Sequence, residues 1–321
     1  MTYNVLAPRL CIPRFFPTCL PEHAETETRW LKVHRRVQQE CASRAIIALQ
    51  EVDVDWARRL LVLFAEQGYR CVFAQYGGPF TGHMGVLLAW PRDEYETLEV
   101  AIARVSGSVP DEAPYGILSR CEPPDPERRQ DDEWNLAKQK TNEAIFVRLR
   151  PHAPSPSFCV GTYHMPCLFG DLAKVRALNI QTCMLLQRFK DFARDDAAVL
   201  MGDFNFKPKT SAYVLAASGG AFDVALEAFP AEVSGLVPWC SALPFFPAGL
   251  ASAYHSFHGS EPLFTNFTET FVETLDYIWF TPGPLQVVEC PPLPSPGEAH
   301  GPFPNAAEPS DHLPLQATFV L

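Results

Sequence analysis

The chain lacks any apolar run close to the roughly 18 consecutive residues that a membrane span requires. Met1–Arg9 lacks the charged stretch, apolar stretch and small-residue cleavage site of a secretory signal, so we expect no such signal. The ten cysteines include no Cys-x-x-Cys pair, which disfavours a structural zinc site. We therefore expect reduced thiols and an intracellular, cytoplasmic location.

The chain also contains few basic residues relative to acidic ones. Lys and Arg total 26 against 37 Asp and Glu, which gives a net charge of −11. This balance argues against a broad basic surface that wraps duplex nucleic acid, although it leaves room for a local basic groove over phosphates. The apolar fraction is 47% and the charged fraction 20%, ordinary values that exclude a disordered or fibrous chain. No repeat of 20–50 residues is present, which argues against a solenoid or propeller.

What the chain has in abundance is proline, with 31 residues gathered in clusters between short apolar runs. This pattern predicts strands joined by long surface loops. Apolar residues at three- to four-residue spacing predict the helices, and compact apolar runs predict the strands. The predicted helices cover 25–44, 56–67 and 172–194, and the predicted strands cover 45–49, 85–90, 144–149, 158–162, 198–201, 277–280 and 315–320.

Many strands with few helices predict an α/β fold in which two packed β-sheets are flanked by helices, a four-layer sandwich. No change in composition marks a domain boundary, so we predict a single domain over residues 1–321. Two segments, near 106–140 and 230–262, are predicted to be surface insertions. The second is apolar enough to pack against the domain.

Polar residues with catalytic capability stand at the ends of the predicted strands. Each alone has a simpler interpretation, such as a turn residue, a helix cap or a hydrogen-bonded histidine. Together, carboxylates, histidines and amides at strand ends indicate a divalent-metal site with acid–base partners. The residues are Asn4, Glu51, His164, Asp203, Asn205, Asp276, Asp311 and His312.

The order of the short motifs around these residues resembles the endonuclease/exonuclease/phosphatase superfamily, which includes deoxyribonuclease I and the abasic-site endonucleases. The resemblance runs from residue 2 to residue 320. Within it, Phe264–Thr268 leading into Thr274–Trp279, together with Met1–Ala7, is similar to the deadenylase, nocturnin and angel branch. The motifs are Thr2–Asn4, Leu49–Glu51, Tyr163–His164, Gly202–Asn205, Leu275–Ile278 and Ser310–His312.

The resemblance implies a deoxyribonuclease I-like fold and a magnesium site. Glu51 would be a metal ligand, with Asn4 and Asp311 nearby to complete or orient its shell. Mg²⁺ prefers hard oxygen ligands and keeps several waters, so one or two carboxylates suffice. Mn²⁺ is the expected substitute.

The resemblance also implies the residues that act on the phosphate. Asp203 would orient and deprotonate the attacking water, and Asn205 would hold the scissile phosphate or the water. His312, paired with Asp276, would bind or protonate a phosphate oxygen, because a carboxylate partner favours the imidazolium. His164 would donate a second hydrogen bond to the phosphate.

The resemblance also implies a substrate contact. In the deadenylase branch, a phenylalanine at the position of Phe271 stacks on a purine base. The alternative is that Phe271 packs in the core. Phe206 and Lys207 follow Asn205 and either flank a nucleotide or pack within their loop. Met165–Cys167 departs from the deadenylase pattern and is expected to border the substrate.

These residues predict a Mg²⁺-dependent phosphoesterase that acts on RNA 3′ ends as a 3′→5′ exoribonuclease of deadenylase type. One alternative is a small-nucleotide phosphatase acting on the 2′-phosphate of NADP(H) or on a 2′,3′-cyclic phosphate. Another is an inactive binding module with the same fold. No leucine-rich repeat precedes the motifs, so we expect a monomer without scaffold docking of that kind.

Overall fold

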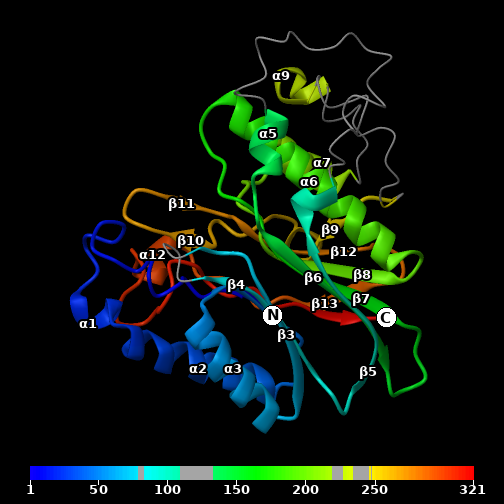
Figure 1. Ribbon diagram of the computed structural model, residues 1–321, viewed down its shortest axis with the longest axis horizontal. Coiled ribbons are helices and arrows are strands. Elements are labelled where there is room, and N and C mark those ends of the chain that lie inside the picture. Colours follow the sequence, from blue (N-terminus) through cyan, green and yellow to red (C-terminus); the bar gives the residue numbers. More distant parts are fainter. Residues whose placement is uncertain (79–82, 109–132, 219–226, 234–245, 247) are drawn as a thin grey trace.

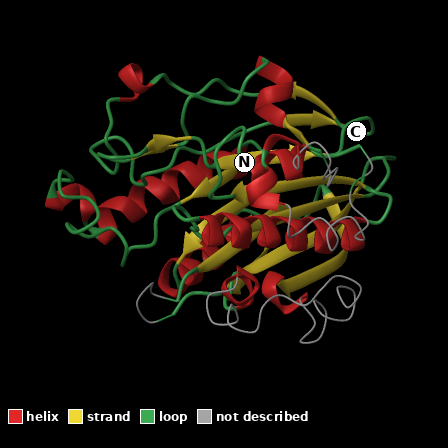
Figure 2. Ribbon diagram, turned by 90° about the horizontal axis from the view of Figure 1, so that it is seen from above, coloured by secondary structure: helices red, strands yellow, loops and turns green. Residues whose placement is uncertain are grey.

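Two β-sheets lie face to face in the computed structural model, and helices cover both outer surfaces (Figure 1). The structure describes residues 1–78, 83–108, 133–218, 227–233, 246 and 248–321. Figure 2, seen from above, shows helices lying across the strands of one sheet. The predicted four-layer α/β sandwich is confirmed.

The first sheet has the strand order β1-β2-β4-β3. Strands β1 and β2 run parallel, and the other neighbours are antiparallel. Helices α2 and α3 cover its outer face. The bounds are β1 (Thr2–Asn4), α2 (Thr26–Ala42), β2 (Ile47–Val52), α3 (Val54–Glu66), β3 (Tyr69–Gln75) and β4 (Gly85–Pro91).

The helix layer on this sheet is held by side chains at helical spacing. Trp30, Val33 and Val37 of α2 are buried, as are Trp56 of α3 and its neighbours on the same face. Asp53 caps α3 by accepting a hydrogen bond from the amide of Trp56 at 2.7 Å. The predicted helix 56–67 therefore begins two residues earlier, at Val54.

The second sheet has the order β5-β6-β7-β8-β12-β9. Only β7 and β8 run parallel among these described neighbours. Its outer face is covered mainly by the long helix α6, whose buried residues pack on β6 and β7. The bounds are β5 (Tyr95–Arg104), β6 (Glu143–Pro151), β7 (Phe158–His164), α6 (Leu172–Ala193), β8 (Ala197–Asp203), β9 (Ala251–Ser252) and β12 (Asp276–Phe280).

The interior between the two sheets is apolar. Ala48 and Leu88 of the first sheet meet Val147, Val199 and Ile278 of the second, and all five are buried. Burying both faces of a sheet explains why these strands read as nearly continuous apolar runs. This packing fixes the strand ends of the two sheets relative to each other.

Shorter elements complete the described part of the chain. None of its helices combines the length and apolar character that a membrane span needs. The elements are α1 (Pro21–Ala24), the 3₁₀ helix η2 (Val105–Ser108), α5 (Glu133–Lys138), α7 (Ser211–Ala217), α9 (Pro230–Val233), α11 (Ala253–His258), β10 (Asn266–Phe267), β11 (Val272–Glu273), β13 (Gln286–Glu289), α12 (Pro296–Ala299) and β14 (Thr318–Val320).

The two predicted insertions fall partly outside the described residues, at 109–132, 234–245 and 247. The described end of the first one packs inward, because Ala137 of α5 is buried against α6. The other residues of α5 are half-buried or exposed, so this segment lies at the surface of the α6 layer, with Ala137 as its buried contact. Leu250 and Tyr254 of the second segment are buried, as its apolar composition predicts. The single domain stays a prediction.

Candidate active site

Strand pairing brings the predicted polar residues to one edge of the sandwich. His164 ends β7 and lies opposite Asp203 at the end of β8. Asp203 in turn lies opposite Asp276, which opens the antiparallel strand β12. In the first sheet, Asn4 ends β1 beside the end of β2, which carries Glu51. The register of neighbouring strands therefore gathers side chains that are far apart in the sequence.

Glu51 reaches the site through a local irregularity of β2. The pairing of β2 with β4 shifts register between Leu49 and Val52, and Glu51 has a φ of 58°. A bulge of this kind re-aims a side chain, and a positive φ in a residue other than glycine is costly. The carboxylate accepts hydrogen bonds from Asn4 Nδ2 at 3.1 Å and from the Ala7 amide at 2.9 Å.

Asp203 is the centre of the cluster. Its Oδ2 accepts a hydrogen bond from Asn4 Nδ2 at 2.9 Å and lies 3.5 Å from His164 Nε2 and 3.7 Å from His312 Nε2. Burial is the main cause that raises the pKa of Asp203 to about 6, and the nearby carboxyl of Asp276 adds to it while the two imidazoles oppose it. A carboxylate poised near neutral pH suits a general base.

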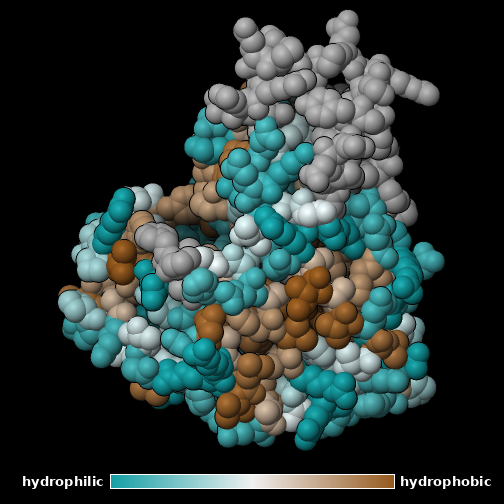
Figure 3. All heavy atoms as spheres, viewed as in Figure 1, coloured by the Kyte–Doolittle hydropathy of each residue, from teal (hydrophilic) through white to brown (hydrophobic). Residues whose placement is uncertain are grey.

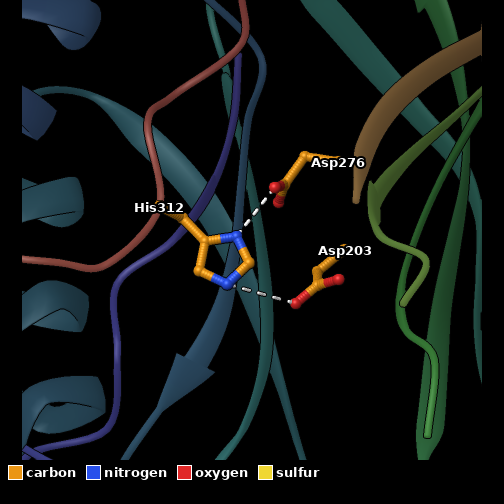
Figure 4. Close-up of side chains that lie close together, drawn as sticks. All are labelled: Asp203, Asp276 and His312. Atoms are coloured by element: carbon orange, nitrogen blue, oxygen red, sulfur yellow. Dashed lines mark hydrogen bonds and ion pairs between the residues drawn. The ribbon is translucent and has the colours of Figure 1, made fainter. Parts of the chain in front are cut away.

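His312 is held between two carboxylates, as Figure 4 shows. Its Nδ1 lies 2.7 Å from Asp276 Oδ2, and its Nε2 faces Asp203. Burial disfavours the charged imidazolium, but Asp276, Asp311 and Asp203 outweigh it and raise the pKa of His312 well above 6.5. These carboxylates therefore favour the imidazolium, whose Nε2 is directed at the place where Asp203 would activate water.

Thr265 supports this pair, a role that the sequence motifs did not assign. Its hydroxyl donates to Asp276 Oδ2 at 2.6 Å and accepts from the amides of Leu275 and Asp276. The neighbouring Asn266 donates from Nδ2 to Asp311 Oδ2 at 2.9 Å. Both residues lie in the Phe264–Thr268 motif, which supported the family resemblance, and this motif is the signal from which their roles could have been predicted.

Two residues hold His164 in place, one through its ring and the other through its backbone. Tyr76, which directly follows β3, places its hydroxyl 2.5 Å from His164 Nδ1, and Asn142 donates to the His164 carbonyl at 2.8 Å. Neither residue belongs to the motifs found in the sequence. Tyr76 directly follows a strand, as several polar residues of the motifs end or follow one, and this position is the signal that could have found it.

The oxygen donors at this edge fit a hard cation. Glu51 and Asp311 offer carboxylate oxygens, the ligands that Mg²⁺ prefers. Asn4 turns its Nδ2 toward Glu51, while its Oδ1 accepts from the Leu6 amide at 3.0 Å, so it is placed to orient Glu51 rather than to bind the ion. Burial raises the pKa of the Asp311 carboxyl, and the nearby Glu51 adds to this effect. Crowded carboxylates of this kind are stabilised by a bound cation. One atom each of Asp203, Asp276 and His312 also lies close enough to share an ion, but His312 Nδ1 is already bonded to Asp276.

A cavity of about 640 Å³ opens over the cluster. Phe271 lies on its wall, half-buried, with its ring 5.8 Å from that of Phe169 and 5.9 Å from Lys207 Nζ. Phe271 is therefore not a core residue. Lys207 forms an ion pair with Glu273 at 2.8 Å. The Met165–Cys167 loop also lines the cavity, as expected.

Phe206 and Asn205 have contacts that the sequence motifs did not specify. Phe206 is only 1% exposed and packs among aromatic rings of the core, with Tyr277 and Trp279 as neighbours. It is removed from the substrate-binding set, because a buried ring cannot flank a nucleotide. Asn205 lines the cavity, but its Nδ2 donates to the carbonyl of Met165 at 2.8 Å. Its backbone has a φ of 48°, a second strained position at the site.

A larger cavity of about 940 Å³ opens elsewhere, between the sheets and beside Met1 and Leu321. Figure 3 shows an apolar area on this face, near the two termini marked in Figure 1. Its walls include the core residues Val160, Val199 and Ile278. None of the strand-end residues described above lines it, so the smaller cavity is the candidate active site.

The family model of the endonuclease/exonuclease/phosphatase family matches residues 1–312. The chain belongs to this family. Over 227 residues it is 31% identical to the CCR4-Not complex 3′-5′-exoribonuclease subunit Ccr4 of Aspergillus niger, covering 60% of this chain and 32% of that protein. Over 202 residues it is 32% identical to nocturnin of Drosophila melanogaster, covering 59% and 29%. The chain thus spans about a third of the length of these relatives.

Among solved structures, the chain resembles ANGEL2, a 2′,3′-cyclic phosphatase solved in complex with adenosine-2′,3′-vanadate. The TM-score is 0.72 at 19% identity, over 99% of this chain and 94% of that chain. At this identity the similarity supports the fold. The two curated relatives confirm the resemblance to the deadenylase and nocturnin branch, and ANGEL2 shares its fold.

Proposed function

We propose that this chain is a Mg²⁺-dependent phosphoesterase that acts as a 3′→5′ exoribonuclease on RNA 3′ ends. The observation that carries the proposal is the convergence on Asp203 Oδ2 of one amide and two imidazoles from three other segments, Asn4, His164 and His312. Acid, base and hydrogen-bond donors are thereby gathered around one point, beside oxygen donors for a metal. The exoribonuclease named among the relatives supports the choice of substrate.

In this proposal, Glu51 and Asp311 would hold Mg²⁺, and Asn4 would orient the Glu51 carboxylate through its Nδ2. The ion, when bound, supplies positive charge near the phosphate. Asp203 would take the proton of the attacking water. The imidazolium of His312, kept charged by Asp276, and the Nε2–H of His164 would donate to phosphate oxygens. Asn205 would fix the loop of Met165 and present its remaining amide donor to the phosphate.

A second candidate function is hydrolysis of a small nucleotide, either a 2′,3′-cyclic phosphate or the 2′-phosphate of NADP(H). Lys140 is the one Lys or Arg among the described residues that line the active-site cavity. A cavity with so few cations suits a substrate with few phosphates. The function of ANGEL2 as a 2′,3′-cyclic phosphatase also supports this candidate.

The deciding experiment compares Mg²⁺-dependent release of mononucleotide from labelled oligoadenylate with hydrolysis of adenosine 2′,3′-cyclic phosphate and with phosphate release from NADPH. Stepwise shortening of the oligoadenylate from its 3′ end supports the first proposal. Preference for either small substrate supports the second. If no substrate is turned over with either Mg²⁺ or Mn²⁺, the result would favour an inactive binding module with the same fold.

We propose that the active species is an intracellular monomer.

A further inference from the structure

Tyr76 contacts the candidate active site from behind His164. Its hydroxyl oxygen lies 2.5 Å from His164 Nδ1, and the two rings meet edge to face with centroids 5.8 Å apart. Tyr76 is buried and lines the cavity. The sequence motifs assign it no role.

The backbone holds Tyr76 in place on both sides. Its amide donates to the Met84 carbonyl at 2.9 Å, and its carbonyl accepts from the Thr141 hydroxyl at 3.0 Å. Asn142, next to Thr141, donates to the carbonyl of His164. The two residues that directly precede β6 therefore hold the backbones of both the tyrosine and the histidine, so that their contact is a built feature of the fold.

The hydrogen-bonding capacity of the Tyr76 hydroxyl and of His164 Nδ1 indicates which of them is the donor. Burial raises the pKa of Tyr76 well above 10, with the carboxylates of Glu51 and Asp203 adding to it, so the phenol keeps its proton. His164 Nδ1 is an acceptor that lies within hydrogen-bond distance of this protonated phenol oxygen. The hydroxyl hydrogen is then directed to His164 Nδ1.

When Nδ1 accepts a hydrogen bond, a neutral imidazole carries its proton on Nε2. His164 Nε2 lies 3.5 Å from Asp203 Oδ2 and 4.0 Å from Glu51 Oε1. The tautomer selected by Tyr76 thus presents an N–H to the carboxylate cluster. The opposite tautomer would present a lone pair to two carboxylates, which is unfavourable.

We propose that Tyr76 is a positioning residue, whose hydroxyl fixes the Nε2–H tautomer and the ring orientation of His164 so that this histidine donates to the substrate phosphate. The part concerning the phosphate rests on the proposed phosphoesterase function. The part concerning the tautomer rests on the contacts of Tyr76 alone.

The test compares Tyr76→Phe with a matched control, Tyr163→Phe. Tyr163 precedes His164 in the chain and is also buried, but its hydroxyl donates to Gln181 on the other face of the sheet. With ¹⁵N-labelled histidine, NMR of the wild-type protein should show His164 protonated at Nε2 and unprotonated at Nδ1. Tyr76→Phe should mix the tautomers, and Tyr163→Phe should leave them unchanged.

The kinetic arm uses a double-mutant cycle with His164→Ala. Loss of a group that orients a site residue costs about 10- to 100-fold in activity, so Tyr76→Phe should lower kcat by this factor and change KM less. In the His164→Ala background, Tyr76→Phe should cause no further loss, because the hydroxyl acts through the imidazole. A merely structural role would lower activity equally in both backgrounds.

Three results would overturn the proposal: a proton on His164 Nδ1 in the wild-type protein, unchanged tautomers in Tyr76→Phe, or equal losses of kcat with and without His164. If Tyr76→Phe does not fold, the wild-type tautomer still decides. If the wild-type protein hydrolyses no phosphoester, the proposed function fails, while the NMR result separately supports or overturns the role of Tyr76.

Discussion

Arg29 of α2 donates from Nε to the carbonyl oxygen of Pro309 at 2.5 Å. Nη2 of the same guanidinium donates to the carbonyls of Val5, at 2.8 Å, and Leu6. Val5 follows Asn4, and Pro309 precedes the segment that carries Asp311 and His312. One fully buried cation therefore joins two segments of the candidate site from behind.

Arg29→Met should destabilise the protein and loosen both segments, because it leaves the carbonyls of Val5, Leu6 and Pro309 without their donor. A buried acceptor left unsatisfied costs about 1–3 kcal/mol, and three carbonyls lose their donor, so we expect the free energy of unfolding to fall by at least about 3 kcal/mol. Urea denaturation measures this loss. The exposed Arg35 on the same helix supplies the control variant Arg35→Met, which should change stability little.

Glu51→Ala should nearly abolish Mg²⁺-dependent activity while the fold stays intact. The side chain lies at a strand end, where its removal costs little core packing and relieves repulsion with Asp311. Initial rates across a Mg²⁺ titration, with circular dichroism as the check on folding, measure the effect. Glu66→Ala, at the exposed end of α3, is the control and should behave like the wild-type protein. Near-normal turnover in Glu51→Ala would contradict the metal assignment.

The pKa of Asp203 predicts how stability depends on pH. Burial raises the pKa of Asp203 from 3.8 to about 6, so the folded protein binds more protons than the unfolded chain between these values. Ionisation of Asp203 in the metal-free protein thus becomes increasingly destabilising as the pH rises from about 4 to 6. The melting temperature of Asp203→Asn, relative to that of the wild-type protein, should rise across the same range. A difference that stays constant with pH would contradict the prediction.

Phe271→Ala should weaken binding of a terminal base by about 1–3 kcal/mol, the usual contribution of stacking on an aromatic ring. Its ring is half-buried on the cavity wall, so the melting temperature should change only modestly. Turnover of a bis-nitrophenyl phosphodiester, which has no nucleobase, should be nearly unchanged. Phe257→Ala removes a ring that is 45% exposed and does not line the cavity, and it serves as the control. Equal KM values for oligoadenylate in both variants would argue against stacking.

Binding of a long oligonucleotide should depend only weakly on salt. Lys140 is the one Lys or Arg among the described residues that line the cavity, so few phosphates should be neutralised. The slope of log affinity against log salt should correspond to about one to three released counterions. Lys140→Met should reduce the slope by about one. A much steeper slope would reveal a basic groove outside the cavity.

Short, regular patterns were enough to predict the layers of the fold and the polar strand ends. The apolar spacing of α2 and α6 and the apolar runs of β7 and β8 appear in the structure within a few residues of their predicted bounds. The strands β3 and β5 were missed, because most of their positions are half-buried or exposed and include charged residues, so that neither forms a compact apolar run. Their identity as strands comes from pairing with β4 and β6.

The sequence by itself determined the family and the residue types of the candidate site. Each short motif alone is weak evidence, but six motifs in a fixed order are specific. Only the tertiary structure decided which of these side chains meet and what supports them. Phe206 and Phe271 are both phenylalanines near site motifs, yet one is buried in the core and the other lines the cavity. Arg29, Tyr76 and Thr265 act through contacts across 280, 88 and 11 residues of sequence. Such contacts arise from the packing of whole sheets and helices, which local patterns do not encode.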